Sequence, residues 1–107
     1  MDIVNLVNSY YDNQLFDPPI LITLINQITF DDEDPWEADT PLGESACSDC
    51  GEGEVSVATL LNNFNAWRAD TTNIGSHDNA QLFSSHDFSA YALGYASVSA
   101  MCTSNQP

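Results

Sequence analysis

The chain has 107 residues, which is enough for one domain and too few for two. Hydrophobic residues make up 43% of it, more than a disordered chain usually carries. Sixteen acidic residues face one basic residue, Arg68, and the formal net charge is -15. This charge repels phosphates and anionic lipid surfaces, so nucleic-acid binding is excluded. A soluble surface, the binding of cations or the binding of a basic partner is compatible with it.

No apolar run approaches the roughly 20 residues that cross a bilayer, and no basic segment followed by an apolar one opens the chain at Met1. We therefore expect neither a membrane segment nor a signal peptide within this sequence. The three cysteines are Cys47, Cys50 and Cys102, an odd number that leaves one thiol without an internal partner. The odd thiol suggests that the chain is part of a longer protein.

Helical periodicity marks two segments. From Asp2 to about Gln14, apolar residues recur every three or four positions, and Asp17 followed by two prolines ends the pattern. The same spacing returns from Val55 to about Ala69. Both segments are predicted to be amphipathic helices.

Strand character marks three other segments. Ile20–Phe30 is nearly continuous in apolar residues and rich in β-branched ones, which predicts a central strand covered on both faces. Ala80–Ser84 and Leu93–Cys102 are shorter strand candidates. The order of helices and strands predicts an α/β layer with helices packed on a mixed, mostly parallel sheet, in which the last strand runs antiparallel.

The segment Asp31–Glu54 differs from its surroundings. It holds ten of the sixteen acidic residues and shows no apolar period, so it is predicted to be a long acidic loop. It also contains Cys47 and Cys50 in a CxxC motif. In a secreted protein these two form a short-loop disulfide. Zinc or redox use is disfavoured, because no second ligand pair has finger-like spacing and the surrounding acids oppose a reactive thiolate.

Four short motifs resemble a known family. They are Trp67-Arg68, Ser76-His77-Asp78-Asn79-Ala80-Gln81-Leu82-Phe83, Asp87-Phe88, and Gly94-Tyr95-Ala96 followed by Met101-Cys102. In this order and with this spacing they resemble the reprolysin (adamalysin) family of metzincin zinc endopeptidases, which includes snake-venom and ADAM-type proteases. The predicted Asp2–Gln14 helix and Ile20–Phe30 strand look like the first helix and second strand of that family. The resemblance thus covers residues 1–107 as part of a catalytic domain, with 31–54 as an acidic insertion.

The resemblance implies the upper subdomain of a metzincin, an incomplete α/β unit with a twisted sheet, packed helices and an antiparallel edge strand. The family's first strand should precede Asp2, and its zinc helix, HExxHxxGxxH, should follow Pro107. That helix supplies three histidine ligands to zinc and a glutamate that polarises the attacking water. This chain contains only His77 and His86, neither in an HExxH motif. We therefore expect zinc, catalysis and the rest of the catalytic domain only in the complete protein.

The same resemblance assigns a substrate-binding strand. An extended peptide substrate would add to it as an antiparallel strand through main-chain hydrogen bonds. Small side chains suit that role, although Ser99 stands where the family often has glycine. The residues of this strand are Gly94, Tyr95, Ala96, Ser97, Val98, Ser99, Ala100 and Met101. The alternative is an ordinary edge strand.

Asp78 matches the aspartate of the HDxA motif, which helps many family members to bind a structural calcium ion. A capping or turn aspartate is the alternative. His77 is expected to be a packed, hydrogen-bonded histidine rather than a ligand, whereas His86 receives no role. Cys102 corresponds to a family cysteine that pairs near the end of the complete domain.

Three functions stay open at this point. The first is a fragment of a secreted or ectodomain zinc endopeptidase. The second is a non-catalytic relative that keeps the sheet as a protein-binding module. The third is an acidic extracellular domain whose calcium-associated loop, Asp31–Glu54, is the working surface.

Overall fold

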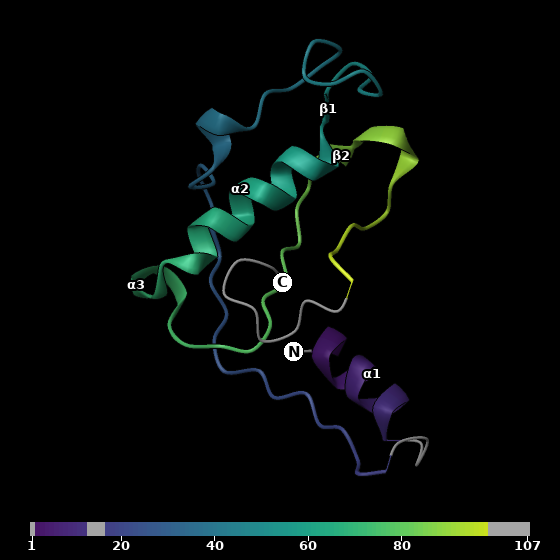
Figure 1. Cartoon of the computed structure of the whole chain (residues 1–107), viewed down its shortest axis with the longest axis vertical. Coiled ribbons are helices and arrows are strands. Elements are labelled where there is room, and N and C mark those ends of the chain that lie inside the picture. Colours follow the sequence, from purple (N-terminus) through teal and green to yellow (C-terminus); the bar gives the residue numbers. More distant parts are fainter. Residues whose placement is uncertain (1, 13–16, 99–107) are drawn as a thin grey trace.

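The computed structural model describes residues 2–12 and 17–98 (Figure 1). Its elements are α1 (Asp2–Tyr11), the 3-10 helix η1 (Glu37–Asp39), β1 (Glu54–Val55), α2 (Val57–Ala69), α3 (Thr71–Ile74), β2 (Asp87–Phe88) and the 3-10 helix η2 (Ser89–Tyr91). Strands β1 and β2 pair in parallel, with Glu54 opposite Asp87. The coarse expectation of mixed helices and parallel strands is confirmed, but the sheet formed by the described residues has two short strands.

Helix α2 is the central element. The hydroxyl of Ser56 caps its N-terminus by accepting a hydrogen bond from the backbone N–H of Thr59 at 3.3 Å. Asp70 lies between α2 and α3 and caps the start of α3. Its carboxylate accepts hydrogen bonds from the hydroxyl of Thr72 at 2.7 Å and from the backbone N–H of Thr72 at 3.0 Å. These two bonds lower the pKa of Asp70 from its ordinary value. The predicted helix 55–69 therefore agrees with the structure to within two residues.

The hydrophobic core is an aromatic cluster that packs on α2. Its centre is Trp36, which is only 3% exposed. The Trp36 ring lies edge-on to Phe64 at 5.5 Å and to Trp67 at 5.4 Å between ring centroids, and Phe30 approaches it at 5.8 Å. Edge-to-face pairs of this kind add stability beyond the apolar area that they bury. The buried members of the core are Trp36, Val55, Leu60, Phe64 and Ala80.

The acidic segment Asp31–Glu54 is less of an isolated loop than its composition suggests. It contributes Trp36 to the core, and its residue Leu42 forms an antiparallel bridge with Val55. The hydroxyl of Thr40 donates to the carbonyl of Trp36 at 2.9 Å and accepts from the amide of Asn63 on α2 at 3.1 Å. A single aromatic residue, Trp36, thus anchors the acidic segment to the core, and the absence of an apolar period in the segment could not reveal this anchor.

Ile20–Phe30 does not form the predicted central strand. It is extended, as the chain runs from beside α1 towards the α2 and α3 end of the molecule (Figure 1), but it pairs with no strand in the part of the chain that the structure describes. Side-chain contacts hold it instead: Asn8 of α1 bonds both the N–H and the carbonyl of Ile22, at 2.7 and 2.6 Å. Most of its apolar side chains are consequently exposed, and Leu21 is 79% accessible. A strand needs neighbours for its backbone groups, and local composition cannot supply them.

The two other predicted strands also differ. Ala80–Ser84 is irregular, although Ala80 is buried against α2, and the residues that do pair lie just beyond it in β2. Leu93–Cys102 is irregular over residues 93–98, and its residues 99–102 lie outside the described part. The predicted first helix ends at Tyr11, and residues 13 and 14 of that prediction lie outside the described part as well. Among the described residues, no helix is both long and apolar enough to cross a membrane.

The aromatic cluster makes a stability prediction. Trp36→Ala should lower the free energy of unfolding by about 3 to 5 kcal/mol, because it removes a buried indole and leaves a cavity on α2. Urea denaturation followed by circular dichroism measures the change. Phe83→Ala is the matched control: Phe83 is 69% exposed, so its loss should cost less than about 0.5 kcal/mol. Equal effects of the two substitutions would show that Trp36 does not organise the core.

Candidate functional site

The predicted substrate-binding segment is described over residues 94–98, and Ser99, Ala100 and Met101 lie outside the described residues. Residues 94–98 are open to solvent apart from the half-buried Ser97, and Val98 is 92% exposed. Within the described chain, their backbone N–H and carbonyl groups form no hydrogen bond with another segment. The segment therefore offers an unpaired main chain, but it is not paired as the edge strand that was predicted.

A groove of about 550 Å³ runs beside this segment. Most of the side chains that face it are apolar. One wall is α2, another is the stretch around Ala80, and the third is the segment itself. The lining residues are Val57, Leu60, Leu61, Phe64, Asn79, Ala80, Gln81, Leu82, Phe83, Phe88, Leu93, Gly94, Tyr95, Ala96 and Ser97. An unpaired backbone next to an apolar groove can bind an extended peptide through its main chain and one row of side chains.

The turn at η2 positions the start of this segment. The hydroxyl of the buried Ser89 accepts a hydrogen bond from the backbone N–H of Val57 at 3.2 Å, which ties the turn to the first residue of α2. Ala90 and Tyr91 both have a φ of 57°, in the left-handed region that residues other than glycine seldom occupy. The turn redirects the chain from β2 towards the groove.

Asp78 does not gather further ligands in the structure. Its side chain is exposed. Over residues 2–12 and 17–98, three metal-binding side chains converge in one place only, formed by Asp34, Glu37 and His86. Asp78 thus belongs to no group of three such side chains among the described residues, and its calcium role stays a prediction.

His77 is hydrogen-bonded, as predicted. Arg68 has only donors, so its Nη1 donates to Nε2 of His77 at 3.0 Å, and Nδ1–H of His77 donates to the carbonyl of Gly75 at 2.8 Å. Arg68, 2% exposed, also donates from Nε to the side-chain oxygen of Asn65 at 3.3 Å. Burial lowers the pKa of Arg68 from its ordinary value. His77 serves to hold a buried guanidinium, and its two nitrogens are occupied.

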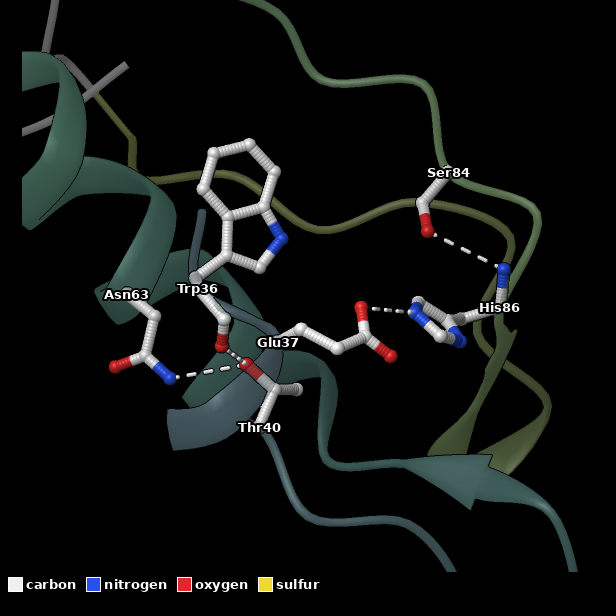
Figure 2. Close-up of polar contacts among 6 residues, drawn as sticks. All are labelled: Trp36, Glu37, Thr40, Asn63, Ser84 and His86. Atoms are coloured by element: carbon white, nitrogen blue, oxygen red, sulfur yellow. Dashed lines mark hydrogen bonds and ion pairs between the residues drawn. The ribbon is translucent and has the colours of Figure 1, made fainter. Parts of the chain in front are cut away.

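His86, to which the sequence assigned no role, points towards the side chain of Glu37 (Figure 2). Its Nε2 lies 3.6 Å from Oε2 of Glu37. Sequence patterns could not have paired the two, because they are far apart in the chain and belong to no common motif. Cys47 and Cys50 do form the predicted disulfide.

The contact between Arg68 and His77 gives a second prediction. His77→Phe removes one acceptor from a buried guanidinium and should lower the free energy of unfolding by about 1 to 3 kcal/mol. Asp78→Asn, at the exposed neighbouring position, should change it by less than about 0.5 kcal/mol. Chemical denaturation of both variants decides the matter. A His77→Phe variant as stable as the original chain would mean that the bond contributes nothing.

The residues of this chain do not fit the catalytic zinc of the resembled family. His77 is engaged with Arg68 and Gly75, and His86 lies beside the acidic segment rather than in a helix with a second histidine one turn away. Neither residue is part of an HExxH motif. No catalytic step can therefore be assigned to residues of this chain.

Comparison with known proteins supports the resemblance. Snake venom metalloproteinase Ac1 of Deinagkistrodon acutus is 44% identical to this chain over 50 residues, which are 46% of the chain and 25% of that protein. The match thus spans about a quarter of the length of this curated relative. No solved structure matches the chain significantly. The model of the reprolysin (M12B) family of zinc metalloproteases matches residues 51–107, more than half of the chain, and the chain belongs to that family.

Proposed function

We propose that this chain is the N-terminal, substrate-binding part of a zinc-dependent metalloendopeptidase, which hydrolyses peptide bonds in the complete protein. Membership of the reprolysin family supports the activity. The match to only a quarter of the snake-venom relative supports the idea of a partial catalytic domain. The proposed architecture is the upper subdomain of a metzincin, with residues 31–54 inserted into it.

The observation that carries this proposal is the unpaired main chain of residues 94–98 beside the apolar groove. In the proposed function, Gly94–Met101 pairs with an extended peptide as an antiparallel strand, and the peptide's side chains enter the groove along α2. Main-chain pairing supplies affinity that is largely independent of the peptide sequence, whereas the groove supplies preference. The small side chains of Ala96 and Ser97 leave room for the approaching backbone.

The remainder of the catalytic domain is the other partner. Ile20–Phe30 presents a row of exposed apolar side chains, of which Leu21 and Ile25 are 79% and 67% accessible. Such a row is uncommon on the surface of a soluble monomer. We expect further strands of the complete sheet to cover it and the zinc helix to face the groove. Asp78 would then meet its additional calcium ligands in the complete domain.

The complete protein is proposed to be secreted or to be an ectodomain. The disulfide between Cys47 and Cys50 is compatible with an oxidising compartment. The relative of 44% identity is described as a snake venom protein.

The proposed activity is tested in two steps. The coding sequence beyond Pro107 should contain HExxHxxGxxH. A protein extended to include that motif should cleave labelled casein in a zinc-dependent way. The chelator 1,10-phenanthroline should abolish the cleavage, because the metal activates the attacking water. A stop codon directly after Pro107, or an extended domain without proteolytic activity, would leave a protein-binding module.

The strand-pairing role makes a separate prediction. Alternate residues of an antiparallel strand direct their N–H groups to the same partner, and proline has no N–H. Of Ala96→Pro and Ser97→Pro in the extended protein, one should therefore lower kcat/KM for a fluorogenic peptide by about tenfold or more and the other clearly less. Equal losses would indicate a packing effect and contradict the strand role.

A further inference from the structure

The side chains of Asp34, Glu37 and His86 converge outside the proposed substrate site. Each offers one potential ligand atom, and these atoms lie within 4.8 Å of one another. All three residues are half-buried. His86 Nε2 and Glu37 Oε2 are 3.6 Å apart, which is too long for a hydrogen bond. Two ligands at about 2.0 to 2.2 Å from one tetrahedral zinc ion lie roughly 3.4 Å apart, so the separation fits a shared ion better than a direct bond.

Both sides of this cluster are held in place before any ion binds (Figure 2). Glu37 begins η1, which Thr40 ties to Asn63 of α2 at 3.1 Å. On the other side, the backbone N–H of His86 donates to the hydroxyl of Ser84 at 3.2 Å, directly before β2. A metal site needs ligands whose positions are fixed by rigid elements. The two arms come from segments about 50 residues apart, and they meet because the core brings η1 and β2 together.

A second observation comes from the buried indole of Trp36. Its Nε1–H has no hydrogen-bond partner among the described residues, although the residue is only 3% exposed. Figure 2 shows this nitrogen on the edge of the ring that is turned towards Glu37 and His86. A buried donor without an acceptor is costly. A water bound to a metal ion, or a carboxylate oriented by that ion, would supply the missing acceptor.

The acidic residues around the cluster favour a cation, and the types of the three ligands indicate which metal ion it is. An opening of about 490 Å³ at the cluster is bordered mainly by acids, from Asp31 to Asp34 together with Glu37. Their mutual repulsion falls when a cation binds among them. Calcium and magnesium prefer oxygen ligands alone, whereas one imidazole with two carboxylates suits zinc and leaves a fourth position for water.

We propose that Asp34, Glu37 and His86 form a zinc-binding site that clips the acidic segment to the strand β2. This site is separate from the catalytic zinc of the family and does not depend on the proposed peptidase activity. Its ligands come from the inserted segment and from the residue before β2. By bridging them, zinc stabilises the folded chain, since the unfolded chain does not hold the three ligands together.

The test is calorimetric titration of the 107-residue chain with zinc chloride, in a Cys102→Ser background so that the odd thiol does not compete. We expect a single zinc ion per chain. Asp34→Asn, Glu37→Gln and His86→Gln should each weaken binding by about tenfold or more. Glu33→Gln removes a neighbouring charge without removing a ligand, so it should weaken binding clearly less than the ligand substitutions do. His77→Gln removes the other histidine and should leave the affinity unchanged.

Nitrogen NMR of the histidine rings gives a second readout that needs no variant. Zinc should shift the His86 ring resonance and leave that of His77 in place. This result does not depend on whether the ligand variants fold. No zinc binding, binding unchanged by His86→Gln, or displacement of zinc by equimolar calcium would each overturn the proposal. The last outcome would indicate a purely acidic, oxygen-only site.

Discussion

The packing of Trp36 between the acidic segment and α2 is the contact on which the rest of the structure depends. Residues 31–54 carry ten acidic groups, and their repulsion drives this segment away from a compact state. A single indole, with Thr40 bonded to Asn63 beside it, holds the segment against the helix. The burial of Trp36 thus overcomes the charge repulsion of the segment. As a result, the acids next to Trp36 are held close together beside α2.

Two functional proposals rest on the same helix for different reasons. At its N-terminal end, α2 fixes Ser89 and so directs residues 93–98 along the groove. On its side, α2 fixes η1 and so places Glu37 opposite His86. A rigid helix with loops at both ends is a common way to position binding residues. Changes in α2 would therefore be felt at both places, although the two are chemically unrelated.

Local patterns predicted what depends on local interactions. The 3.6-residue period located α2, and the CxxC spacing in an oxidising context indicated the disulfide. Ile20–Phe30 was wrong as a central strand because strand formation depends on neighbouring strands, and the described residues provide none. The pair of Glu37 and His86 could not be predicted, because it depends on how η1 meets β2. Family motifs did identify the segment around Gly94, but its role as a substrate strand remains a proposal.

Arg68 has a consequence that follows from its burial. It is the only lysine or arginine of this sequence, and it is 2% exposed inside α2. Proteases of the trypsin type cleave after these two residues, so the folded chain presents them with no accessible cleavage site. Unfolding of α2 would open this site, and cleavage there would separate the α2 wall of the groove from residues 79–97 on its other side. Burial of this one side chain therefore links resistance to trypsin-type cleavage to the folding of α2.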